Sequence, residues 1–251
     1  MHKTAFTLAI LLFFAANPLI AQELQPLGLP ALSSTVNESG ETQYSLSLQV
    51  LALMTAITVI PSLLLGMTSF TRIIIVLSIL RQALGTQQTP PNQVLIAIAL
   101  FLSFYIMAPA LTVIYETSIN PYLDGIIGPN IAIENARDVI YTFLIANTRP
   151  ETITIFAELR GITEFSSQDE VPFSILLPSF ITSELKTAFQ IGFLLFLPFL
   201  VIDMVIASLL MSLGMMMLSP MLIALPFKLL LFVLVDGWGM TIGSLAATFQ
   251  V

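Results

Sequence analysis

Several residue types that carry enzyme chemistry are absent from this sequence or scarce in it. It contains no cysteine, which excludes disulfides, thiol nucleophiles and cysteine-ligated metals. His2 is the only histidine, so a histidine-based metal site and a Ser-His-Asp triad are excluded as well. The net charge is −7 and no basic cluster occurs, so we expect no nucleic-acid partner. We therefore predict a protein that is not an enzyme and has no metal or cofactor.

Charge of either sign is also rare, and long apolar runs take its place. Charged residues make up 9% of the chain, against about 25% in soluble domains, and mean hydropathy is +0.96. Prolines such as Pro61 and Pro109 fall inside the apolar runs and should kink them. We predict an all-α integral membrane protein with four long apolar helical segments in kinked hairpins. These runs are Leu46 to Met67, Val94 to Tyr115, Ile191 to Met217 and Met221 to Phe249.

The first residues are typical of an export signal. A basic start, an apolar stretch from Ala5 to Ala16 and a small residue at Ala21 predict a cleavable signal peptide over 1–21. An uncleaved anchor is the alternative, but the apolar stretch is short for a span of about 20 residues. Residues 22–45 are polar and contain Pro and Gly, so we interpret them as an extended periplasmic lead-in.

The rest of the chain divides into two hairpins and a polar insert. The N-terminal hairpin covers 46–115, the insert 116–190 and the C-terminal hairpin 191–251. The insert holds ten acids and four bases, with helical apolar spacing over 131–146 and 153–159. Arg72 and Arg81 lie between the first two runs, so that loop should face the cytoplasm. The insert, which we predict to be a small helical subdomain, and the C-terminus are then periplasmic.

A methionine-rich stretch lies between the third and fourth runs. Five of the 11 methionines fall between Met211 and Met221, and Gly214 and Pro220 bracket Met215, Met216 and Met217. We expect a hairpin turn on the cytoplasmic side. Methionine is flexible and polarizable, so such a cluster can either fill gaps in a core or close around objects of varying shape. Packing and a deformable gate are both open explanations.

Three charges lie inside the last two runs. A lone charge there costs roughly 2.5 to 3.5 kcal/mol on the insertion scale, so each needs a partner or water. If the chain turns near Met217, Asp203 falls close to Lys228, across the hairpin or between neighbouring copies. The pair is either a neutralised packing contact or part of an ion path. Asp203 with Asp236 could also form an aspartyl-protease dyad, although their depths in the membrane differ.

Other residues indicate contacts between subunits. Gly239, Gly243 and Ala247 recur every four residues, a pattern that allows helices to approach closely. Glu184 and Lys186 are two apart on a helix and must seek different partners, in an assembly interface or in solvent. We predict as assembly contacts Arg72, Glu184, Lys186, Asp236, Gly239 and Gly243.

Several further segments of the sequence are long and not of low complexity. They are Met67 to Val76, Ala83 to Thr86, Pro90 to Val94, Leu177-Pro178 with Ser183 to Phe193, Pro198 to Asp203, Gly214 to Met217, Ala224 to Lys228 and Val235 to Trp238. In these segments the sequence resembles the FliP family of bacterial flagellar type III export-gate proteins. The resemblance covers the chain from about Leu46 to its end, except that 116–171 match only in length and character.

This resemblance implies an inner-membrane protein at the flagellar basal body. Family members assemble as several copies, here expected as a homo-oligomer of about five, in a spiral with FliQ and FliR. FlhA, FlhB and the MS ring surround that gate. Unfolded flagellar subunits pass through it, and membrane lipid surrounds the assembled complex. Met1 to Ala21 favours the flagellar branch, because virulence-secretion counterparts generally lack a signal peptide.

Two functions from different classes follow. In the first, the chain is a channel subunit whose Met215, Met216 and Met217 form a gasket that excludes water and yields around a passing polypeptide. In the second, it is an ion-coupled membrane transporter that uses Asp203, Lys228 and Asp236 as a relay. No repeated half is visible in the sequence, which counts against the transporter.

Overall fold

The computed structural model describes residues 32–36, 42–46, 48–86, 88–162, 165, 170–215 and 218–250. The predicted signal peptide over 1–21 lies outside the described residues. So do Met216 and Met217, two of the three gasket candidates.

Contacts within the chain divide it into two units, Met1–Pro61 and Ser62–Val251. The first unit contains an antiparallel pair of strands, β1 (Leu32–Val36) and β2 (Thr42–Leu46), with Ser34 opposite Tyr44. These strands fall in and just beyond the predicted lead-in. Helix α2 (Leu48–Gly66) starts in this unit and contains Pro61.

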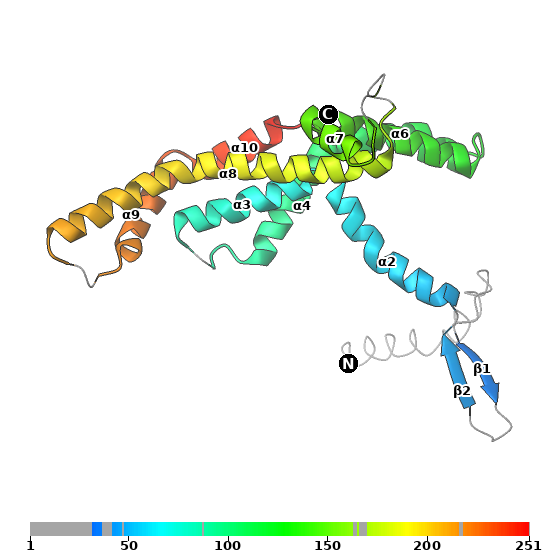
Figure 1. Ribbon diagram of the computed structural model, residues 1–251, viewed down its shortest axis with the longest axis horizontal. Helices are drawn as coiled ribbons and strands as arrows, with labels where there is room; N and C mark the ends of the chain where they lie inside the picture. Colours follow the sequence, from blue (N-terminus) through cyan, green and yellow to red (C-terminus); the bar gives the residue numbers. More distant parts are fainter. Residues whose placement is uncertain are drawn as a thin grey trace, which may run out of the picture. The chain divides into compact units, whose positions relative to one another are not determined.

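In the second unit, every described secondary-structure element is a helix, which confirms the all-α prediction (Figure 1). Two helices, α6 (Pro129–Asn147) and α7 (Pro150–Glu158), lie where the apolar spacing of the insert predicts helices. Helix α4 continues through a π-helical turn, η1, into α5, so its axis runs beyond the predicted end at Tyr115. The elements are α3 (Phe70–Leu84), α4 (Asn92–Ile114), η1 (Tyr115–Ile119), α5 (Asn120–Leu123), α6 (Pro129–Asn147), α7 (Pro150–Glu158), α8 (Phe173–Ser212), α9 (Pro220–Leu234) and α10 (Gly237–Ala247).

Helix α8 runs through position 190/191, where the sequence suggests a boundary between the insert and the C-terminal hairpin. It has 40 residues and includes the polar stretch before Ile191. That stretch stays helical because its polar side chains find partners on neighbouring elements, as described below. Pro172 is the N-cap of α8 and Pro178 lies inside the helix, while the division of the chain at 190/191 stays a prediction.

By length and composition, α8 and the α4–α5 helix (Asn92–Leu123) could each cross a membrane alone. Two bent pairs pass the same test jointly: α2 with α3, and α9 with α10, the latter bent by 63°. The described residues thus hold two candidate spans, or up to four if each bent pair is one span. The upper count matches the number of predicted apolar runs.

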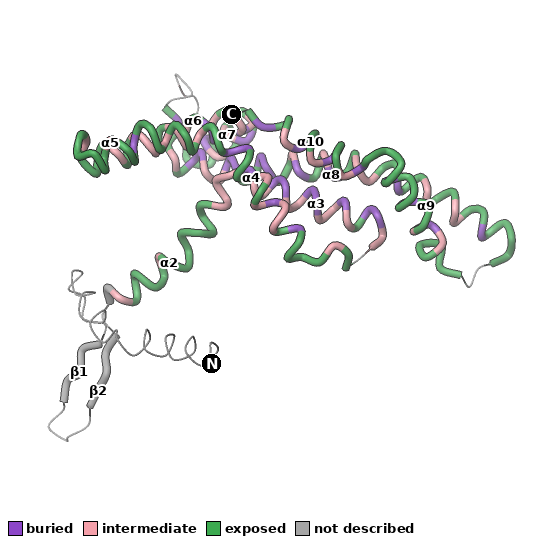
Figure 2. The backbone as a smooth tube through the Cα atoms, turned by 180° about the vertical axis from the view of Figure 1, so that it is seen from behind, coloured by how far each residue is buried: buried purple, intermediate pink, exposed green. Residues whose placement is uncertain are grey.

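Helix α3 lies alongside α8 at the centre of the second unit (Figure 1). Gly192 permits the close approach, because a Cβ at that position would lie 3.2 Å from Ile79 Cβ and overlap the end of the Ile79 side chain. Ile73, Val76 and Leu77 of α3 are fully buried in the core that α4, α6, α8 and α10 complete. Figure 2 shows α3 mostly buried or intermediate, whereas α5 and α9 are mostly exposed.

Candidate functional site

The methionine-rich turn begins where α8 ends in a Schellman motif. Gly214 has a positive φ of 71°, which glycine adopts without steric cost. Its N–H donates to the Met211 carbonyl, and the Met215 N–H donates to the Leu210 carbonyl, each across 3.0–3.1 Å. Pro220 starts α9, where its missing N–H costs nothing. These residues make the sharp turn that Gly214 and Pro220 predict.

Met215 is exposed at this turn, with 43% of its surface accessible. Met211 and Met221, at the adjoining ends of α8 and α9, are exposed as well. None of these three described methionines fills the core of the chain. The gasket role of Met215, Met216 and Met217 stays a prediction.

The structure brings Asp203 and Lys228 together within one chain. Lys228 Nζ donates to Asp203 Oδ2 across 2.6 Å and to the Ala83 carbonyl across 3.0 Å. Lys228 is almost fully buried, whereas the Asp203 side chain is 35% exposed. Ala83 lies in the last turn of α3, where helix carbonyls lack partners and a cation is favourable. One ammonium group therefore fastens α3, α8 and α9 together.

Asp236 serves a separate purpose, as the N-cap of α10. Its backbone is left-handed, with φ 50°, and its carboxylate accepts from the Gly239 N–H across 3.4 Å. A Cβ at Gly239 would collide with that carboxylate, which explains the glycine locally. Gly239, Gly243 and Ala247 are all exposed, and nothing in the chain lies within 4 Å of a Cβ built at Gly243. The assembly role of this stripe stays a prediction.

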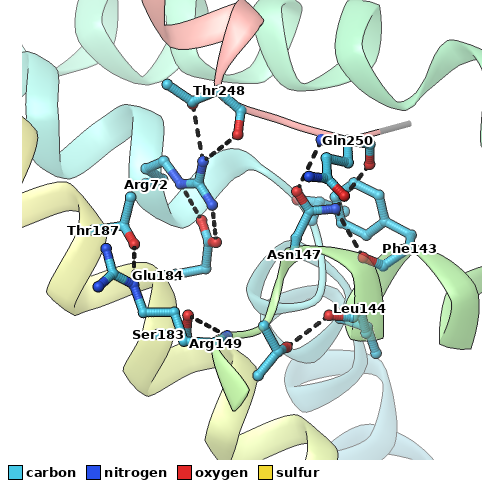
Figure 3. Close-up of polar contacts among 12 residues, drawn as sticks. Arg72, Phe143, Leu144, Asn147, Arg149, Ser183, Glu184, Thr187, Thr248 and Gln250 are labelled. Atoms are coloured by element: carbon cyan, nitrogen blue, oxygen red, sulfur yellow. Dashed lines mark hydrogen bonds and ion pairs between the residues drawn. The ribbon is translucent and has the colours of Figure 1, made fainter. Parts of the chain in front are cut away.

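Arg72 and Glu184 form a buried ion pair between α3 and α8 (Figure 3). Arg72 Nε donates to Glu184 Oε2 across 2.9 Å, and Arg72 Nη2 donates to Glu184 Oε1. The side chains are 5% and 0% exposed. Two parallel charge-assisted bonds are the strong arrangement for a guanidinium and a carboxylate. Both residues were predicted as assembly contacts; here each has its partner inside the chain.

The remaining donors of Arg72 bind the segment after α10. Arg72 Nη1 donates to the Thr248 carbonyl across 3.0 Å and to Thr248 Oγ1 across 2.9 Å. The guanidinium also lies 3.9 Å above the centre of the Phe249 ring, a favourable cation–π contact. Sequence reasoning missed Thr248 and Phe249. They are 176 and 177 residues from Arg72, and no spacing rule links such distant positions.

The side-chain amide of Asn147 also binds this segment, and it contacts only main-chain groups of Gln250. Its Nδ2 donates to the Gln250 carbonyl across 2.9 Å, and its Oδ1 accepts from the Gln250 N–H across 3.0 Å. Figure 3 shows Asn147 and Arg72 approaching Thr248–Gln250 from α6 and α3. The sequence offers no signal that would single out Asn147.

Arg149 connects the turn between α6 and α7 to the polar stretch of α8. Its backbone N–H donates to Ser183 Oγ across 3.1 Å, and its side chain donates to Thr187 Oγ1 and Gln190 Oε1. Lys186, by contrast, is exposed. Glu184 and Lys186 thus face different surroundings, as their spacing predicts. Across the described residues, no group of three or more His, Cys, Asp or Glu side chains is placed to hold a metal ion.

A known protein family matches most of the second unit. Residues 53–245 match the FliP family. The chain belongs to the FliP family. The match contains α3 to α9 and nearly all of α10, including the ion pair of Arg72 and Glu184, the pair of Asp203 and Lys228, and the methionine-rich turn. This family does not consist of enzymes, in agreement with the prediction made from the residue inventory.

Curated relatives extend the similarity over almost the entire chain. The flagellar biosynthetic protein FliP of Cereibacter sphaeroides is 66% identical over 235 residues, 94% of this chain and 78% of its own length. FliP of Pectobacterium carotovorum subsp. carotovorum is 49% identical over 99% of this chain and 94% of its own. FliP of Bacillus subtilis is 47% identical over 85% of this chain and 96% of its own.

Proposed function

We propose that the chain is a pore-forming subunit of the flagellar type III export gate. Unfolded flagellar subunits would cross the bacterial inner membrane through the assembled gate. The observation that carries this proposal is membership of a family whose curated relatives are named flagellar biosynthetic proteins. Long apolar helices that could cross a membrane support the same conclusion.

We place the methionine-rich turn at the narrowest point of the pore. Support comes from Gly214 and Pro220, which hold Met215 exposed at a sharp turn, away from the core of its own chain. Several copies of such a turn around one axis would close a hole with flexible apolar side chains. A constriction of this kind excludes water and ions by dewetting, and methionine can yield around a moving polypeptide.

The proposed setting is the inner membrane at the flagellar basal body. The chain would assemble as a homo-oligomer of about five copies with FliQ and FliR, beside FlhA, FlhB and the MS ring. The insert and the C-terminus would be periplasmic, following Arg81, which bonds Pro90 and Asn92 at the opposite end of α3 from the contacts of Arg72 with Glu184 and Thr248. The exposed small-residue stripe of α10 and the exposed Lys186 are available for contacts between subunits.

The test is a leak assay on assembled complexes. Replacing Met215, Met216 and Met217 with alanine should leave assembly intact and make the membrane permeable to ions or small molecules. Matched controls are Met211→Ala and Met221→Ala, which change exposed methionines just outside the turn and should leave permeability unchanged. Unchanged permeability in the triple variant, or an equal leak in the controls, would contradict the gasket.

The ion-coupled transporter is the weaker alternative. Lys228 uses a second donor on the Ala83 carbonyl, at the end of α3. This contact favours a structural role for the pair, because a fixed proton relay does not need a helix-capping bond. Asp203→Asn decides between the two: lost transport in fully assembled complexes would support the relay.

A further inference from the structure

We propose that Thr248–Gln250 form a latch that holds α10 beside a partly open apolar cavity, and that release of this latch widens the opening of the cavity. The proposal concerns one chain and does not depend on the export function. The cavity has a volume of about 500 Å³ and lies between α8, α9 and α10. Its walls include Leu195, Pro198, Leu231, Phe232, Thr241 and Ser244.

The middle of α10 packs only partly against the rest of the chain. Thr241 is buried and Met240 is 62% exposed, and both line the cavity, where atoms facing a void lose dispersion contacts. The outer side of α10 carries Gly243, where a Cβ would meet nothing within 4 Å. The position of α10 is therefore determined mainly at its two ends.

The first end is anchored by aromatic packing. Gly237 lies directly against the Phe232 ring, where any Cβ would overlap ring atoms. Trp238 packs edge-on against the same ring, with centroids 5.5 Å apart. The carboxylate of Asp236 caps this end. This anchor lies within one continuous stretch of chain, so it persists when the other end moves.

The second end is anchored by the latch together with Leu245, which is buried in the core. Arg72 holds the Thr248 carbonyl and hydroxyl, and Asn147 holds the main chain of Gln250 at both polar groups (Figure 3). Between them, the Phe249 ring lies under the Arg72 guanidinium and stacks on Phe143, with ring centroids 6.5 Å apart.

The latch can open without breaking the buried ion pair, although Arg72 Nη1 loses its two acceptors on Thr248. Arg72 keeps both bonds to Glu184 after Thr248 leaves. The Asn147 amide keeps its bond to the Phe143 carbonyl, 2.8 Å away. An unpaired buried charge is a large penalty, and here none is created. The arrangement therefore has the properties of a reversible contact.

The absence of cysteine makes the test simple, because an introduced thiol is the only one in the chain. Thr241→Cys places a reporter on the cavity wall, at a position that is 5% exposed. The rate of its reaction with N-ethylmaleimide is measured in the full-length protein, extracted in mild detergent. Adding Asn147→Ala removes the clamp on Gln250 and should raise this rate about tenfold, as the loss of two hydrogen bonds implies.

Two controls separate latch release from loss of the fold. Asn135→Ala makes the same substitution on the same helix and removes one amide bond to the Thr117 carbonyl, 2.9 Å long, so it should leave the rate unchanged. Ala99→Cys, a fully buried reporter in the core, should stay unreactive in the Asn147→Ala background. An unchanged rate at Thr241→Cys would overturn the latch. Faster labelling at both reporters would overturn it too, because it would mean general unfolding.

Discussion

Lys228 of α9 and Asp203 of α8 meet across 2.6 Å, and the same ammonium group binds the Ala83 carbonyl at the end of α3. The contact with Ala83 turns a two-helix ion pair into a three-helix junction. It also satisfies a carbonyl that the helix itself leaves unpaired. Replacing Lys228 should therefore remove the contact with α3 as well as the ion pair between α8 and α9.

Lys228→Met should destabilise the protein by about 2–3 kcal/mol. Removing one partner of a buried pair costs about 3–5 kcal/mol, and the partly exposed Asp203 carboxylate lowers this value. Asp203→Asn should cost more, about 3–5 kcal/mol, because it leaves the almost fully buried Lys228 ammonium without a countercharge, even though the amide oxygen can still accept its hydrogen bond. The measurement is the free energy of unfolding in detergent. Lys186→Met, an exposed lysine on α8, is the control and should change stability by under about 0.5 kcal/mol.

Arg72→Lys should cost about 2–4 kcal/mol, although the charge is kept. Lysine has no planar fork, so it cannot bind Glu184 at two oxygens, reach Thr248 and stack on Phe249 together. Thermal unfolding of the extracted protein measures the loss. Arg137→Lys changes an exposed pair with Asp138 and should have almost no effect. Equal effects at both positions would contradict the role of the buried pair.

Gly192→Ala should separate α3 from α8 and destabilise the protein by about 1–3 kcal/mol. The added methyl group would overlap the Ile79 side chain and lie only 3.2 Å from its Cβ, which a change of rotamer cannot move away. Shortening that side chain in the Gly192→Ala, Ile79→Ala double variant should recover part of the loss. Gly243→Ala adds the same methyl group where nothing lies within 4 Å, and should be neutral or stabilising in the isolated chain. If Gly243→Ala nevertheless reduces assembly, the stripe on α10 contacts another subunit.

Gly214→Ala should strain the methionine-rich turn by about 1 kcal/mol. The φ of 71° at this position is left-handed, and a Cβ makes that conformation unfavourable. Gly214→Asn should be milder, because asparagine visits this region more readily. Both variants are compared in the leak assay and by thermal unfolding. The gasket proposal expects the larger leak from alanine; an identical leak from both would show that the turn geometry does not control closure.

Patterns local in sequence were sufficient to predict much of the fold. Apolar spacing predicted α6 and α7 because a helix repeats every 3.6 residues. The turn between α8 and α9 follows from Gly214 and Pro220. Asp203 could be placed near Lys228 because the arms of an antiparallel hairpin pair positions at similar distances from the turn.

Other features depended on contacts between residues far apart in sequence. The polar stretch around Ser183 and Gln190 looked like a boundary, yet it is the middle of one helix, because Arg72 and Arg149 supply its partners. Asn147 and Thr248 could not be identified as binding residues, since no local pattern distinguishes them from other polar residues near helix ends.

The sequence by itself determined that this is a helical membrane protein with a methionine-rich hairpin turn, because hydropathy, glycine and proline act over a few residues. The tertiary structure alone decided which face of α8 meets α3, and that Arg72 joins Glu184 to the segment after α10. Those contacts join residues more than 100 positions apart, and their energies depend on packing and burial that exist only in the folded chain.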